Sequence, residues 1–276
     1  MIESFLEYFI LLKWGFLAGI LFAWSIAFTA PFIVLRKNAL FPHAITHVLF
    51  FSIIFSVFAL KIQSSFLIYL INLIVISLAI SGIVFIKRYL KLYEDTATSL
   101  ITHFAFALAL IISSKVPSYE TKIFSYLFGS FLTIEKDEFF LSIITLITTL
   151  LFYKKFSSLW ISQITDREIP GINFGLSNFS FLILLSLQIT IGINIMGVLL
   201  VTMFFVASTS VALQIGNSLK NAILLTGFLN TIALFLGAFF SIVIDIPFSA
   251  GCSVILFSFL FILIVFRMFF VKRLKK

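Results

Sequence analysis

The chain has 276 residues, of which 62% are hydrophobic and only 11% are charged, and its mean hydropathy is +1.21. These values exclude a soluble globular domain and predict an all-α polytopic membrane protein with a single transmembrane domain over residues 1–276. The net charge of +8 does not indicate nucleic-acid binding, because the basic residues lie between hydrophobic segments, where they set membrane orientation.

Nine apolar segments are predicted to be membrane-spanning helices, and several approach the roughly 20 residues that a helix needs to cross a bilayer. They cover residues 14–35, 39–60, 66–86, 96–113, 139–153, 179–196, 197–213, 221–244 and 252–271. The sixth and seventh are separated only by the run from Gly192 to Gly197, so eight helices with one broken or re-entrant segment are an equal alternative. The apolar stretch 123–130 is too short to span and is predicted to form a re-entrant or surface helix.

The distribution of Lys and Arg predicts the orientation of these spans. Nine alternating spans place fourteen of the 19 basic residues on one side of the membrane. The other side receives only five, which are Lys13, Lys61, Lys115, Lys122 and Lys136. Because basic residues are enriched in cytoplasmic loops, the bias predicts a cytoplasmic C-terminus and an external N-terminus.

Two of the three histidines, His43 and His47, follow the basic turn at Arg36 and Lys37 and open an apolar segment. Residues four apart lie on one face of a helix, so both imidazoles can address one ligand if the segment is helical. Pro42 is compatible with an early helical position, where its missing N–H costs little. Polar rings carried into hydrocarbon indicate either a functional site or hydrogen-bonded packing residues.

The third histidine, His103, enters the fourth predicted span from the same side as His43 and His47. At roughly 1.5 Å per residue, all three would lie within a layer about 6 Å thick. Three histidines at one depth predict a shared, transient cation site, and the alternative is that each only forms hydrogen bonds within the bundle. The single cysteine, Cys252, excludes a multi-thiolate metal site and an internal disulfide.

Two polar stretches, 154–177 and 207–220, lie on the predicted cytoplasmic side. Each is interpreted equally as a short helix that docks a cytoplasmic partner or as a solvated connector. The candidate coupling residues in the second stretch are Ser208, Thr209, Ser210, Gln214 and Gly216.

On the opposite side, Asp245 closes the eighth predicted span. Pro247 and Gly251 follow it and indicate a turn. The carboxylate of Asp245 is interpreted equally as a cation-attracting outer entrance or as a helix cap for the last span.

Five ordered motifs extend along nearly the whole chain. They are Phe32-Ile33-Val34-Leu35-Arg36-Lys37 with the following His47 segment, the helix from Asp95 to Leu110, Tyr126-Leu127-Phe128-Gly129, Gly197-Val198-Leu199-Leu200-Val201 and Asp245-Ile246-Pro247. These motifs resemble those of the membrane permease subunits of zinc/manganese/iron-type bacterial ABC importers, the ABC-3 family, and the pattern is most similar to the zinc importer permeases. Three substitutions depart from the family pattern: His43 replaces the usual aspartate, Val48 an alanine and Ser208 a proline.

The resemblance implies a type II ABC-importer-like permease that forms a homodimeric channel in the bacterial inner membrane. Two copies would pair with cytoplasmic ATP-binding subunits and receive metal from an extracytoplasmic binding protein. The sequence has no G-x-x-x-x-G-K-[ST] phosphate loop, so ATP hydrolysis is expected in another polypeptide and the chain itself is not expected to be an enzyme.

The cargo is expected to be a transported divalent metal, with no cofactor bound stably. Histidine at position 43 favours zinc, because manganese prefers harder oxygen ligands, although manganese and iron stay open. A membrane-embedded metalloenzyme is the first alternative, but no H-E-x-x-H motif occurs and no glutamate lies near the histidines within the spans. A secondary transporter is the second alternative, and it would require coupling carboxylates near the membrane midplane that the predicted spans do not contain.

Overall fold

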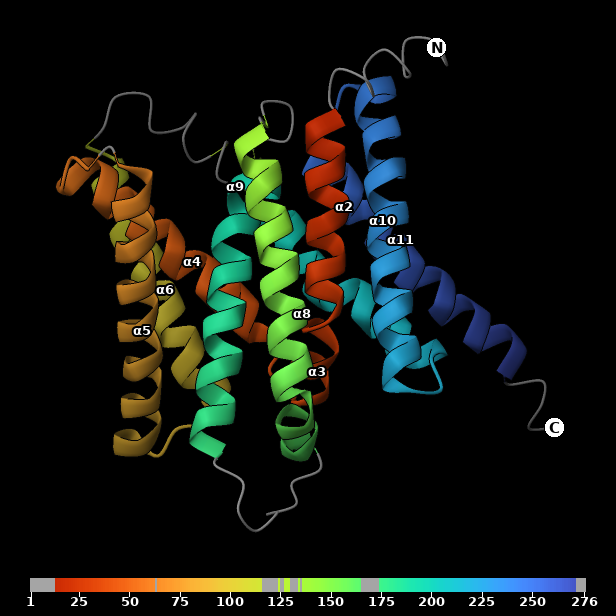
Figure 1. The fold of residues 1–276 in the computed structure, drawn as a ribbon, viewed down its shortest axis with the longest axis horizontal. Coiled ribbons are helices and arrows are strands. Elements are labelled where there is room, and N and C mark those ends of the chain that lie inside the picture. The colour runs from red at the N-terminus through yellow and green to blue at the C-terminus, as the bar shows by residue number, and fades with distance from the viewer. Residues whose placement is uncertain are drawn as a thin grey trace.

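The computed structural model describes residues 13–62, 64–115, 124, 127–129, 134, 136–164 and 174–271. Every regular element within these ranges is helical, which confirms the predicted all-α fold (Figure 1). The π-helical turns η1 and η3 end α4 and α11. The elements are α2 (Lys13–Ala27), α3 (Ala30–Leu35), α4 (Leu40–Ile54), η1 (Phe55–Ala59), α5 (Ser65–Leu90), α6 (Glu94–Ser113), α8 (Lys136–Ile164), α9 (Phe174–Ile215), α10 (Leu219–Ile244), α11 (Phe248–Phe266) and η3 (Arg267–Val271).

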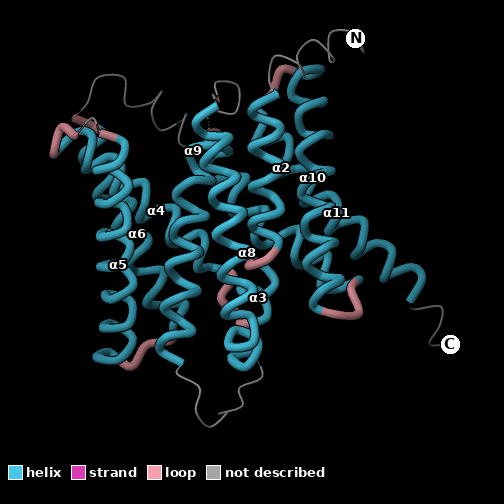
Figure 2. Tube along the Cα trace, viewed as in Figure 1, coloured by secondary structure: helices cyan, strands magenta, loops and turns pink. Residues whose placement is uncertain are grey.

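Eight helical segments in the described part of the chain are long and apolar enough to cross a membrane. The first segment, Lys13–Leu35, contains both α2 and α3. Its helix is interrupted after Ala27, where Pro31 near the start of α3 lacks the backbone donor that a continuous helix would use. Figure 2 shows that the described connections between the long helices are short.

The longest helix, α9, is broken at Gly197, whose φ of 77° and ψ of 166° are not helical. Its 42 residues would extend about 63 Å at 1.5 Å per residue, which exceeds the thickness of a bilayer core. The break therefore divides it into two arms, and the eight-helix alternative with one broken segment describes the helix count. In Figure 1 the first arm rises from the lower side and the second runs obliquely back toward the turn before α10.

Contacts between helices establish the directions of the two arms. The first arm is antiparallel to the α2–α3 segment, because Phe181 contacts Phe32, near the end of that segment, and Gln188 contacts Ser25, which precedes it. The α10 helix is also antiparallel to α2, as the ring pairs Trp24–Phe228 and Phe16–Phe235 demonstrate. The second arm pairs with α10 in reverse order through Thr209–Thr226 and Phe204–Asn230. The two arms thus run in opposite directions, and the described part of the chain traverses the bundle nine times when they are counted separately.

A close contact between two glycine backbones supports the break in α9. Gly129 and Gly197 both have positive φ angles, 75° and 77°. A Cβ atom on Gly197 would lie 2.5 Å from the backbone N of Gly129, so no larger residue fits there. Half of the short helix predicted at 123–130 lies outside the described residues, and Phe124, Leu127 and Phe128 within it are helical.

The centre of the bundle contains a buried polar cluster that joins α2, α8 and α9. The side chain of Gln188 donates to the backbone oxygen and hydroxyl of Ser25 at 2.9 and 3.0 Å and to the hydroxyl of Thr149 at 3.1 Å. Its carbonyl oxygen accepts from Thr29 at 2.8 Å. All four side chains are fully buried, so these hydrogen bonds fix how the three helices are rotated against one another.

Candidate functional site

The α4 helix brings His43 and His47 together, as the four-residue spacing predicted. Their ring centroids are 4.5 Å apart and the rings are nearly perpendicular, at 89°. Pro42 lies in the first turn of α4, and the hydroxyl of Thr46 donates to the carbonyl of His43 at 2.6 Å. His43 is exposed and His47 is partly buried. The Nδ1 atom of His47 is buried and has no hydrogen-bond partner among the described residues.

His103 lies on α6, the helix that packs beside α4 through Phe106. The centroid of the Phe106 ring lies 4.7 Å from the ring centroid of His47 and 5.9 Å from that of Phe50. The Nδ1 atom of His103 is 2.7 Å from the carbonyl of Ser99, one helical turn earlier. His103 is exposed.

The structure thus joins two of the three histidines and leaves the third on the neighbouring helix. Within the described ranges, no three His, Cys, Asp or Glu side chains converge closely enough to hold a metal ion. The shared site of His43, His47 and His103 therefore stays a prediction. Because His43 and His103 face outward from the single chain, such a site requires groups from outside it or a movement of α4 against α6.

Asp245 occupies the turn at the far end of α10, at the top of Figure 1. It is exposed and adopts a left-handed conformation with φ of 58°, which ends α10. The N-cap residue of α11 is Pro247, which makes no side-chain capping hydrogen bond. The interpretation of Asp245 as a cap for the last span is therefore wrong, and its role at an outer entrance stays a prediction.

Most of the stretch 207–220 is helical, so its interpretation as a solvated connector is wrong for all but residues 216–218. α9 continues to Ile215, and only residues 216–218 separate it from α10. Ser208 and Thr209 are fully buried, and Ser208 donates to the carbonyl of Phe204 at 2.8 Å. Ser210 likewise donates to Val206 at 2.7 Å. Hydroxyls bonded to their own helix can stay in an apolar bundle, which the polar composition alone did not indicate.

Of the candidate coupling residues, only Gln214 and Gly216 lie at the α9–α10 turn. Gln214 is exposed, as are Asn217 and Lys220 beside it. This turn lies on the opposite side of the bundle from the turn that contains Asp245 (Figure 1).

Arg36, in the basic turn between α3 and α4, packs against aromatic side chains. Its guanidinium lies 4.3 Å from the centroid of the Phe181 ring and donates to the carbonyl of Trp160 at 3.4 Å. Burial lowers the pKa of Arg36 from 12.5 to about 10, so the side chain stays charged at neutral pH. The centroid of the Trp160 ring lies 5.4 Å from that of Phe32 and 5.1 Å from that of Phe181. These three aromatic rings therefore pack together beside the cation.

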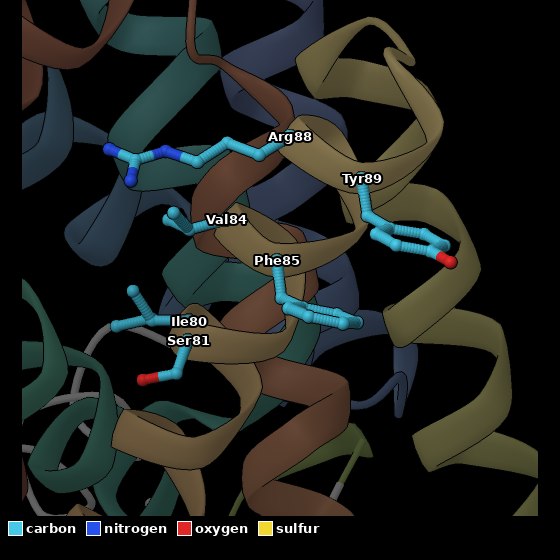
Figure 3. Close-up of a pocket in the computed structure, with 6 residues that line it drawn as sticks. All are labelled: Ile80, Ser81, Val84, Phe85, Arg88 and Tyr89. Atoms are coloured by element: carbon cyan, nitrogen blue, oxygen red, sulfur yellow. The ribbon is translucent and has the colours of Figure 1, made fainter.

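An open hollow of about 590 Å³ lies on the surface of α5, and no histidine lines it. Figure 3 shows its six lining residues, all on one helix: Ile80, Ser81, Val84, Phe85, Arg88 and Tyr89. The rings of Phe85 and Tyr89 stack at 5.6 Å. Its lining holds one cation and none of the metal ligands predicted from the sequence.

Together these features define a class: a polytopic, all-helical membrane protein with paired imidazoles on a membrane helix. The ABC 3 transport family matches residues 8–268, which is nearly the whole chain. The chain therefore belongs to the ABC 3 transport family, as the motif pattern predicted.

Several known proteins are similar to the chain. It is 26% identical over 250 residues to the "High-affinity zinc uptake system membrane protein ZnuB" of Buchnera aphidicola subsp. Acyrthosiphon pisum, covering 88% of this chain and 92% of that protein. It is 24% identical over 189 residues to the "Manganese transport system membrane protein MntC" of Listeria monocytogenes, covering 67% and 66%. The fold matches that of PsaBC from Streptococcus pneumoniae, solved in complex with Fab, with a TM-score of 0.84, 22% identity and 95% coverage of both chains.

Proposed function

We propose that this chain is the membrane permease subunit of an ATP-driven importer of a divalent metal, with zinc as the first candidate cargo. The observation that carries the proposal is the pair of imidazoles, His43 and His47, on a membrane helix of a transport-family chain. The similar ZnuB and MntC proteins are named for zinc and manganese transport, which supports a metal cargo. Neither a metalloenzyme nor a secondary transporter gains support from these relatives.

The exposure of His43 and His103 supports a path between two copies of the chain. An imidazole that faces hydrocarbon loses its hydrogen bonds to water, so a surface that carries it needs polar groups or water against it. A second copy packed against the side formed by α4 and α6 would enclose the rings in a shared channel. Each copy would then supply His43, His47 and His103 as a transient cation site.

The chemistry of this site suits brief binding rather than storage. A complete tetrahedral cage of nitrogen and sulfur ligands holds zinc as a structural ion. Two neutral imidazoles at 4.5 Å between ring centroids, with His103 on the next helix, offer an incomplete ligand set that can pass an ion onward. Imidazole nitrogen suits zinc better than manganese, and this supports zinc as the cargo.

The remaining components follow from the family. Cytoplasmic ATP-binding subunits would supply the energy, and an extracytoplasmic metal-binding protein would deliver the ion near Asp245. The excess of basic residues on one side supports a cytoplasmic C-terminus in a bacterial inner membrane. The α9–α10 turn, with Gln214 and Gly216, would then face the cytoplasm and contact the ATP-binding subunit, while Ser208, Thr209 and Ser210 would transmit its movement within α9.

Reconstitution tests the proposal. The chain and its ATP-binding subunits would be placed in proteoliposomes, and uptake of radioactive zinc and manganese would be measured with and without ATP. We expect ATP-dependent zinc uptake that exceeds manganese uptake. Uptake driven by an ion gradient without ATP would contradict the importer, and ATP-driven uptake of manganese alone would contradict zinc as the cargo.

A further inference from the structure

The turn between α9 and α10 is held firmly at both of its ends. At the end of α9, the N–H of Gly216 donates to the carbonyl of Ala212 at 2.8 Å. A Cβ on Gly216 would lie 2.9 Å from that same oxygen, so the chain needs glycine to close here. At the start of α10, the hydroxyl of Ser218 accepts from the N–H of Asn221 at 3.2 Å. These contacts therefore give the turn a single defined conformation.

A third connection ties the turn to a helix distant in the sequence. The guanidinium of Arg267, where α11 gives way to η3, donates through Nη2 to the backbone carbonyl of Gln214 at 2.8 Å. Its Nη1 donates to the side-chain oxygen of the same residue. The last carbonyls of a helix lack partners within it, and a cation near them interacts favourably with the helix dipole. Arg267 thus completes the end of α9 from outside that helix.

We propose that Arg267 is a positioning residue that makes the α9–α10 turn and the end of α11 move as one unit. The inference rests on the proposed function, in which the ATP-binding subunit contacts this turn. A displacement of the turn by the ATP-binding subunit would then be transmitted to α11 through the guanidinium of Arg267, and to α9 and α10 through the backbone.

The geometry favours this role over a simple gain in stability. Both residues are exposed, and exposed polar pairs add little to the stability of a fold. The planar fork of arginine, however, holds two acceptors of one residue at once, which fixes orientation as well as distance. Lysine can offer its charge at this place but not the same two-point geometry.

The test measures the number of ATP molecules hydrolysed per metal ion carried by the full complex in proteoliposomes. We expect Arg267→Gln to raise this ratio at least about fivefold, within the usual range of coupling between sites, with an unchanged melting temperature. Arg267→Lys should lie between wild type and Arg267→Gln. The control is Arg88→Gln, which removes an exposed cation from α5 and should leave the ratio unchanged (Figure 3).

A double-mutant cycle separates this inference from the proposed function. Gln214→Ala removes the side-chain acceptor but keeps the backbone carbonyl, so it should raise the ratio less than Arg267→Gln does. The double variant should raise it no further than Arg267→Gln alone, because that substitution already removes both hydrogen bonds of the guanidinium. If the wild-type complex carries no metal, the proposed function fails, and the connection is then tested without transport by the distance between spin labels on the α9–α10 turn and at the end of α11. Arg267→Gln should broaden the distribution of that distance, and an unchanged distribution would overturn the connection. A wild-type ratio in Arg267→Gln, or equal losses in Arg88→Gln, would overturn the positioning role.

Discussion

Replacing Gln188 tests how much the buried polar cluster contributes to the fold. The side chain makes four hydrogen bonds, to Thr29, to Thr149 and to two oxygen atoms of Ser25. Hydrogen bonds between membrane helices contribute about 0.6 kcal/mol each on average, so Gln188→Leu should lower the free energy of unfolding by about 2 kcal/mol.

The partners of Gln188 limit the damage that this substitution causes. Without Gln188, Thr29 still donates to Ile26 and the hydroxyls of Ser25 and Thr149 still bond each other at 2.9 Å. No buried hydroxyl is therefore stranded, and the larger penalty for an unsatisfied group does not apply. Gln188→Ala should cost about 1–2 kcal/mol more than Gln188→Leu, because it also leaves a cavity in the core.

Unfolding in a titration with denaturing detergent, followed by circular dichroism, measures these differences. The matched control is Ser186→Ala on the same helix, since Ser186 is buried but its hydroxyl, among the described residues, bonds only the carbonyl of Leu182 within α9. We expect this control to change the free energy of unfolding by less than about 0.5 kcal/mol. Equal stabilities for wild type and Gln188→Leu would refute the role assigned to the cluster.

Three further substitutions test other parts of the structure. Gly197→Ala should lower the free energy of unfolding by about 1–3 kcal/mol or more, from backbone strain alone. The control is Gly82→Ala, where an added Cβ would lie at an ordinary 3.4 Å from Ile101 and should cause no such loss. Equal melting temperatures for the two variants would contradict the close contact at Gly197. Asp245→Asn should reduce zinc uptake at low metal concentration without changing the melting temperature, and unchanged uptake would remove Asp245 from the outer entrance. His43→Asp should retain transport and shift the preference from zinc toward manganese, as uptake competition between the two metals would reveal, because it supplies an oxygen ligand.

Much of the fold could be predicted from the sequence, because membrane helices are long apolar runs whose length the bilayer sets. The glycine at 197 indicated where the sixth and seventh segments meet, but the sequence left open whether the helix breaks there. The reversal of its two arms depends on contacts that the first arm and α10 make with α2, which lies far away in the chain. Local pattern cannot supply such contacts.

The candidate site could be predicted only in part. The pairing of His43 and His47 follows from helical spacing, whereas the position of His103 depends on how α6 is rotated against α4. The interpretation of the stretch 207–220 as a solvated connector treated the hydroxyls of Ser208 and Thr209 as exposed, yet hydroxyls bonded within a helix are compatible with a buried face. The roles of Gln188 and Arg267 could not be predicted from the sequence, because their partners Ser25 and Gln214 are 163 and 53 residues away.

The most direct test of the metal path compares stability and transport in the same preparation of His47→Ala. His47 is partly buried, and its Nδ1 has no hydrogen-bond partner among the described residues, so truncation should change the melting temperature little. If the imidazole binds metal in transit, ATP-dependent zinc uptake per folded molecule should fall at least about tenfold, the loss typical when a ligand environment is disrupted. A protein with lowered melting temperature but normal zinc uptake per folded molecule would contradict the assignment of His47 to the metal path.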